Sequence, residues 1–328
     1  MKNGFYMGYD ASCLDEKEIS RQADLLLDTG LYNAGYQVIR LGRPDGRFSD
    51  IGAFSGALKS RGFSTDITLD NSISVEEAES LIRRTGAQMI TVDAGADHEA
   101  AERLIGAAGK NIRVAVKASK DDLAWASGIA DVVIIDSITD DADFFEITRN
   151  QLDSCRDGDT DPKASEANLR ADAMEEGGTY QPGDLPLKFD FFRNEAVFIQ
   201  FAMLGCPLVI NGDIAGLGKK TLELLKNREI IHVARAGLGR TARYYDPWHV
   251  LITKPFSSRE AYAFILNRCH GDTKTDIVPG DVGWDDQFAC YDLLENRIVA
   301  QKISSYEIHV ETSDHPETPC CRLYRLEH

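Results

Sequence analysis

The sequence lacks a long apolar run and an excess of positive charge. No stretch is long enough to cross a bilayer as a helix, and the first residues show no signal-peptide core. The formal net charge of −17 argues against nucleic acid and anionic membranes as partners, because both bind basic surfaces. We therefore expect neither a membrane nor a nucleic-acid partner.

Cysteine and histidine show no regular spacing. The seven cysteines are odd in number, scattered, and contain no CxxC pair, so we interpret them as reduced thiols of a cytoplasmic protein. The histidines share no metal-ligand spacing, so we expect no metal site and no cofactor. Residues 327–328 resemble the start of an affinity tag and carry no functional weight.

What the chain does contain is an alternation of short apolar strands with helical stretches. Strands are expected at 4–8, 36–41, 65–69, 88–93, 112–116, 131–135, 177–184 and 207–213. This short period predicts parallel βαβ units. Because Gly4-Phe5-Tyr6-Met7-Gly8 is not a GxGxxG loop, we favour a (β/α)8 TIM barrel over a doubly wound sheet.

The pattern changes to period two from about Asp246. Strands are expected at 249–254, 261–266, 303–310 and 321–325, separated by turn residues, which predicts an antiparallel β-sandwich. The expected domains are therefore a barrel at residues 1–243, the candidate catalytic domain, and a C-terminal sandwich at 244–326.

Several of the expected parallel strands end in a carboxylate. Asp93 follows Ile90-Thr91-Val92, Asp136 follows Ile134-Ile135, and Asp70 ends a third strand. Barrels present catalytic groups at the C-terminal ends of their strands. A single aspartate at a strand end more often caps the next helix, but the repetition of the pattern favours a catalytic role for the acids at this end of the sheet.

Several segments carry a family resemblance, including 254–255, 266–268 and 323–326 in the C-terminal part of the chain. Residues 24–36 are similar to a first helix with the turn SGLKDAGY, and 45–48 match DGRF. Residues 206–214 resemble APLLIGNDL, and 221–233 resemble ETLEILSNKEVIAVNQ. In this order and spacing they resemble the family 27 glycoside hydrolases, which are α-galactosidases and α-N-acetylgalactosaminidases. The resemblance runs from end to end and implies the same barrel and sandwich.

The resemblance implies a retaining glycoside hydrolase. The family nucleophile ends the fourth strand, which corresponds to Asp93, and the acid/base follows the sixth, at Asp136, with Asp140 and Asp141 left open. Such a pair of carboxyls lies about 5–5.5 Å apart. Residues 187–190, Leu-Lys-Phe-Asp, are also similar to the family's nucleophile motif LKYDNC, but they lie too late in the chain for the fourth strand.

Substrate contacts are expected from other strand ends, and the expected ligand is a small carbohydrate or glycoside, with a homo-oligomer possible. The candidate substrate-binding residues are Tyr9, Asp10, Arg40, Asp70, Thr91, Lys117, Tyr180 and Asp184.

The family's sugar-reading residues are largely changed in this chain. Gly42 and Arg43 stand where the family has paired aspartates, and Thr91 stands where it has a lysine. Losing buried groups that bind sugar hydroxyls changes specificity strongly, so ordinary galactosidase activity is not expected. The alternative is a catalytically inactive barrel that binds carbohydrate or a partner. A third reading is another barrel enzyme, such as a lyase, that uses Lys117 for a Schiff base.

Overall fold

The computed structural model describes residues 6–135, apart from 45, 94, 96 and 119–121, together with 171–172, 195–196, 198–199, 202–203, 207–210, 212–235, 240–246, 249–267, 273–310 and 320–328. The chain forms two compact units, which are described separately. The first contains the described residues up to 135, with 171–172 and 207–226. The second contains the short helical stretches within 195–203 and everything from 227 onward.

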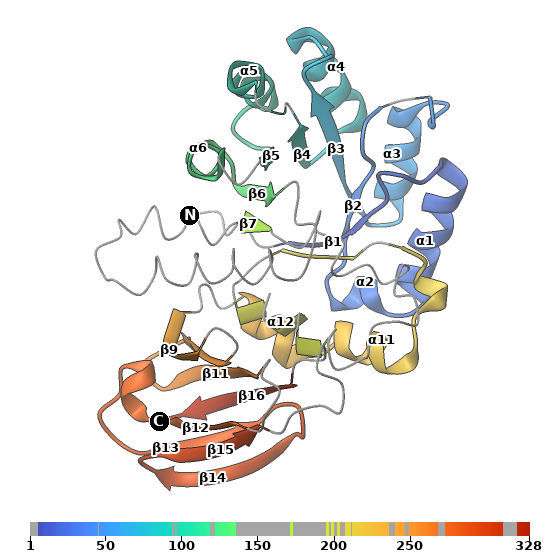
Figure 1. Cartoon of the computed structure of the whole chain (residues 1–328). Coiled ribbons are helices and arrows are strands. Elements are labelled where there is room, and N and C mark those ends of the chain that lie inside the picture. Colours follow the sequence, from blue (N-terminus) through green and yellow to red (C-terminus); the bar gives the residue numbers. More distant parts are fainter. Residues whose placement is uncertain are drawn as a thin grey trace. The chain divides into compact units, whose positions relative to one another are not determined.

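The first unit is built on one parallel sheet (Figure 1). Its strands are β1 (Met7–Asp10), β2 (Val38–Arg40), β3 (Ser64–Asp70), β4 (Met89–Asp93), β5 (Arg113–Ala118), β6 (Val132–Ile135), β7 (Ala171–Asp172) and β8 (Leu208–Ile210). Their order is β7-β6-β5-β4-β3-β2-β1-β8. This is the cyclic order of a (β/α)8 barrel, opened between β7 and β8. A pairing that would close the ring is absent from the described residues, so closure stays a prediction.

The helices of this unit alternate with its strands, and some of them begin at a short polar side chain that caps them. They are α1 (Glu16–Asp28), α2 (Leu31–Ala34), α3 (Ile51–Ser60), α4 (Val75–Thr85), α5 (His98–Ala108), α6 (Leu123–Ile129) and α11 (Lys219–Leu225), with a 3-10 turn η2 (Ile214–Gly216). Asp15 caps α1, and Ser74 forms a capping box with Glu77 at α4. Helices α3 to α6 lie along one side of the sheet (Figure 1).

The second unit contains α12 (Arg228–Arg235), the 3-10 turn η3 (Pro279–Val282) and two antiparallel sheets. The six-stranded sheet has the order β14-β13-β16-β11-β10-β9, and the other pairs β12 with β15. The strands are β9 (Arg240–Asp246), β10 (His249–Pro255), β11 (Glu260–Asn267), β12 (Thr273–Ile277), β13 (Phe288–Asp292), β14 (Arg297–Ile303), β15 (Tyr306–Val310) and β16 (Cys320–Glu327).

One apolar core joins the two antiparallel sheets of the second unit. Ile277 of β12 and Ile308 of β15 pack with Ile265 of β11 and Phe288 of β13 in a single buried cluster. Two sheets that share a core in this way form the layered arrangement predicted for the C-terminal part of the chain.

Several C-terminal strands differ from the expected ones. Strand β9 begins at Arg240, before the expected change of pattern at Asp246, and the expected strand at 303–310 is split between β14 and β15. Strands β12 and β13, and β14 before Ile303, do not correspond to any expected strand. In β14 the side chains are exposed or half-buried along the whole strand, so no apolar alternation marks it. No helix among the described residues is long and apolar enough to span a membrane.

Candidate active site

Three charged residues, Asp70, Asp93 and Lys117, lie at or near the C-terminal ends of the neighbouring strands β3, β4 and β5. Side chains alternate along a strand, so Thr91 and Asp93 share one face of β4, and Asp66, Thr68 and Asp70 share one face of β3. The register places Asp70 opposite Asp93. Lys117 lies near the end of β5, which pairs with β4 on its other side. The expected acidic edge therefore exists at β3 and β4.

Arg43, in the loop after β2, bridges the two carboxylates of this edge. Its Nη1 lies 3.1 Å from Oδ2 of Asp70, and its Nη2 donates to Oδ2 of Asp93 at 3.0 Å. The hydrogen bond to Asp93 is the main reason that the pKa of Arg43 is raised. Arg43 is thus a cation held between two acids.

Asp93 faces a second cation as well. Nζ of Lys117 lies 3.9 Å from the same Oδ2 that accepts from Arg43. Within the described part of the chain, no hydrogen bond or ion pair engages Oδ1 of Asp93. Asp93 does not cap the next helix, because Asp97 does so by accepting from the N–H of Ala100. The carboxylate is therefore free of that structural role and has one oxygen available.

Asp70 is held more tightly than Asp93. Burial by itself would raise the pKa of Asp70, but hydrogen bonds from the hydroxyl and N–H of Ser72, with the charge of Arg43, outweigh it and hold the pKa below its ordinary value of 3.8. Asp70 therefore stays ionised and keeps Arg43 in place.

A buried polar network lies behind this edge. Asp66 is fully buried, and its Oδ2 accepts from Nε of Arg40 at 2.7 Å and from the hydroxyl of Thr91 at 2.8 Å. Arg40 also donates to the hydroxyl of Tyr6, and its Nη1 lies 3.7 Å from Oδ2 of Asp10. Burial raises the pKa of Asp66, and Arg40 and Thr91 only partly offset this. Arg40 and Thr91 are both buried, so the network links β2, β3 and β4 in the interior, next to the strand ends that carry Asp70 and Asp93.

Tyr9 occupies a different position from the other candidate residues. It is buried, and its hydroxyl donates to the carbonyl of Gly212, 2.5 Å away, just after β8. Burial is the main cause of its raised pKa. Tyr9 thereby links β1 to the loop that follows β8. Asp10, on the opposite face of β1, accepts from the N–H of Ser12, and its Oδ2 lies 3.7 Å from Nη1 of Arg40.

Arg47 holds together the loops that follow β1 and β2. Its guanidinium donates to the carbonyls of Ser12 and Leu14 in the first loop, and of Leu41 and Arg43 in the second. Gly42 completes this arrangement, because it has a φ of +72° and a side chain there would collide with Ser12. These contacts fix the backbone from which Arg43 reaches the two acids.

Three of the predicted site residues lie outside the described residues, namely Asp136, Tyr180 and Asp184, as do Asp140, Asp141 and the motif at 187–190. The remaining seven divide into two groups. Asp70, Asp93 and Lys117 meet at the strand ends, and Asp10, Arg40 and Thr91 belong to the buried network, with Tyr9 apart. No cluster of potential metal ligands occurs among the described residues.

Sequence reasoning missed the roles of Arg43 and Asp66. Arg43 was noted only as a departure from the family, and Asp66 only as part of a strand. For Asp66 a signal existed, since a carboxylate in the interior of a strand that is expected to be buried requires a buried partner. For Arg43 no local signal existed, because its partners come from two other strands.

Comparison with known proteins gives one clear result. No protein-family model matches the sequence, and no curated protein matches it. Solved structures do. A β-L-arabinopyranosidase of glycoside hydrolase family 27 from Geobacillus stearothermophilus aligns with a TM-score of 0.79 at 13% identity, covering 100% of this chain and 98% of that one. The α-galactosidase I of Mortierella vinacea aligns with 0.74 at 13% identity, covering 99% and 98%.

The α-galactosidase of Saccharomyces cerevisiae is also similar, with a TM-score of 0.69 at 15% identity, covering 98% of this chain and 97% of that one. At such low identity these likenesses describe the fold alone. They extend over nearly the whole of each chain. The fold therefore resembles that of family 27 glycoside hydrolases, as the sequence motifs predicted.

Proposed function

We propose that the chain is a retaining glycosidase whose nucleophile is Asp93. The observation that supports this most is the position of the carboxylate, at the C-terminal end of β4 and opposite Asp70. Two cations contact Oδ2, and among the described residues no hydrogen bond or ion pair engages Oδ1, the oxygen proposed to attack an anomeric carbon. The similar structures named above are glycosidases that act on α-galactosides or β-L-arabinopyranosides.

The proposed acid/base is Asp136, which directly follows the described end of β6. Strand order supports the pairing, because β5 alone separates β4 from β6 and all three strands are parallel. In the proposed reaction Asp93 bonds to the anomeric carbon while Asp136 protonates the leaving oxygen, whose bond to that carbon breaks. Asp136 then removes a proton from water, which attacks the anomeric carbon and breaks its bond to Asp93, so that the sugar and the free carboxylate are released. The substrate is a small glycoside, and the barrel is proposed to close between β7 and β8.

Turnover of aryl glycosides tests this proposal. We expect the wild type to hydrolyse at least one member of a panel that includes aryl α-galactoside and aryl β-L-arabinopyranoside. Asp93→Asn should lose at least about 10³-fold in kcat/KM, since it removes the nucleophile while keeping the side-chain shape. Asp97→Asn is the matched control, because asparagine also caps a helix and this variant leaves activity nearly unchanged.

A second measurement separates a nucleophile from a positioning group. In Asp93→Gly, added azide should restore turnover of an activated aryl glycoside and give a glycosyl azide of inverted configuration. Full activity in Asp93→Asn would contradict the assignment.

A second candidate function is a non-catalytic carbohydrate-binding protein. The 3.0 Å pair between Arg43 and Asp93 favours it, because a carboxylate held by an arginine is less available for attack. Binding of a sugar without turnover of any glycoside in the panel would support this candidate over the enzyme. The Schiff-base reading loses support, since Lys117 has Asp93 as a neighbour at 3.9 Å.

A further inference from the structure

An open cleft lies beside the candidate active site and shares Arg43 with it. Its volume is about 510 Å³, within the range of about 300–1,000 Å³ that is usual for small-molecule sites. The walls come from the loop after β2, the end of β3 and one side of α4. Asp93 and Lys117 do not line it, so the cleft is distinct from the strand-end acid itself.

The acidic groups of this cleft are already engaged. Asp70 accepts from the N–H and hydroxyl of Ser72 and pairs with Arg43. Glu77 accepts from the N–H of Ser74 in the capping box of α4. Neither carboxylate is therefore well placed to serve as the main acceptor for a ligand.

The two arginine side chains of the cleft, Arg43 and Arg84, have more N–H donors than their carboxylate contacts use. A guanidinium carries five N–H donors. Arg43 is 55% exposed and uses two of them on carboxylates. Arg84 is 58% exposed, and its contact with Asp50 is a loose one at 3.6 Å. Asp50 itself accepts from the N–H groups of Gly52 and Ala53. The cleft therefore offers unused cationic donors rather than unused acceptors.

We propose that this cleft binds a sugar that carries an acidic group, a carboxylate or a sulfate, through the guanidinium groups of Arg43 and Arg84. Arginine presents paired N–H donors that match the oxygens of both acids. The hydroxyls of Ser72 and Ser80 line the same space and suit the neutral part of a sugar.

The shared arginine couples the cleft to the strand-end acid. A ligand acid that binds the unused donors of Arg43 shares one positive charge with Asp93, which weakens the electrostatic attraction between Arg43 and this carboxylate. That the ligand is a sugar rests on the proposed glycosidase function. The inference adds that the substrate, or a sugar unit next to the one that is cleaved, carries an acidic group.

Binding measured by titration calorimetry at low salt tests the inference independently of turnover. The probes are D-galacturonate, galactose 6-sulfate, D-galactose and inorganic sulfate. We expect at least one of the two acidic sugars to bind at least about tenfold more tightly than galactose and than inorganic sulfate. Whether galacturonate or galactose 6-sulfate binds more tightly shows whether the cleft prefers a carboxylate or a sulfate. Asp93→Asn should keep this binding, so loss of turnover and loss of binding are separate results.

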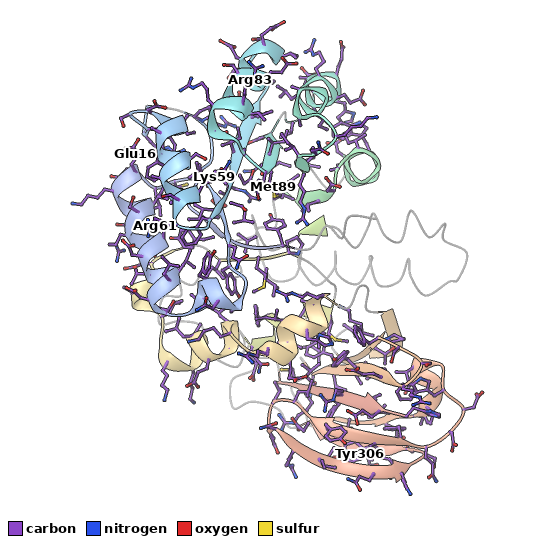
Figure 2. The ribbon with its side chains drawn as sticks, turned by 180° about the vertical axis from the view of Figure 1, so that it is seen from behind. Glu16, Lys59, Arg61, Arg83, Met89 and Tyr306 are labelled. Atoms are coloured by element: carbon purple, nitrogen blue, oxygen red, sulfur yellow. The ribbon has the colours of Figure 1, made fainter. Side chains whose placement is uncertain are left out.

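Variants of the two arginines locate the site. Arg43→Gln and Arg84→Gln should each weaken binding of the acidic sugar by about tenfold. Arg83→Gln is the matched control on the same helix, because Arg83 is exposed on α4 (Figure 2) and does not line the cleft; its affinity should match the wild type. Unchanged affinity in Arg84→Gln, or equal binding of galactose and the acidic sugars, would overturn the inference.

Discussion

At the scale of single residues, Asp66 and Asp70 lie on the same face of β3 in opposite electrostatic settings. Burial raises the pKa of Asp66, whereas the hydrogen bonds from Ser72 and the charge of Arg43 overcome burial and lower the pKa of Asp70. The two acids should therefore change the free energy of unfolding with pH in opposite directions.

For Asp66, the folded protein holds the proton more strongly than the unfolded chain does. Its favourable contribution is complete below the ordinary pKa of 3.8 and is lost as pH rises through the raised value. The melting temperature of the wild type minus that of Asp66→Asn should therefore fall as pH increases above about 4. Thermal melts of both proteins at a series of pH values measure this difference.

For Asp70 the sign is reversed, because its folded pKa lies below 3.8. Its contribution is present above pH 3.8 and is lost as pH falls through the lowered value. The wild type minus Asp70→Asn difference should thus shrink on acidification below about pH 4. The same slope for both pairs of proteins would show that their environments are not opposite.

At the scale of secondary-structure elements, α4 begins with a capping box that also borders the cleft. Ser74 accepts from the N–H of Glu77, and the Glu77 carboxylate accepts from the N–H of Ser74. Ser74→Ala should lower the free energy of unfolding by about 1 kcal/mol, since one N–H of the first turn loses its partner. Chemical denaturation measures this. Ser60→Ala, at the exposed end of α3, is the control and should change it by less than about 0.5 kcal/mol.

The strands β1 to β6 were predictable because the local apolar pattern agrees with their burial in the sheet, whereas the seventh strand, expected at 177–184, lies at Ala171–Asp172. Residues 51–60 form helix α3, since Asp50 caps its start, and β4 ends at Asp93 as expected. The contacts of Arg43 were not predictable. They require β2, β3 and β4 to lie side by side, and nothing in the residues around position 43 indicates a partner 50 positions later. Strand β14 was not predictable for another reason: its side chains are exposed or half-buried, so no buried face produces an apolar period of two in the sequence.

At the scale of the whole molecule, each of the two compact units has apolar residues of its own. Met89 (Figure 2) and Ala115 belong to a buried cluster in the parallel sheet, and the antiparallel sheets share a separate core. The unit that contains the antiparallel sheets includes the described residues within 195–203 and the continuous segment from Asn227 onward, with α12, whereas the sequence pattern places the domain boundary at 243. The boundary at 243 stays a prediction.

Two separate cores predict two calorimetric transitions. Ile67 of β3 and Ile265 of β11 are both fully buried, and each belongs to a different unit. Truncation to alanine removes the same atoms from each and should cost about 2–5 kcal/mol in the unit that contains it. Differential scanning calorimetry should therefore show that Ile67→Ala lowers the temperature of one transition and Ile265→Ala that of the other. If both variants instead lower a single shared transition, the units unfold together, and the sandwich then contributes to the stability of the strand ends that hold Asp93.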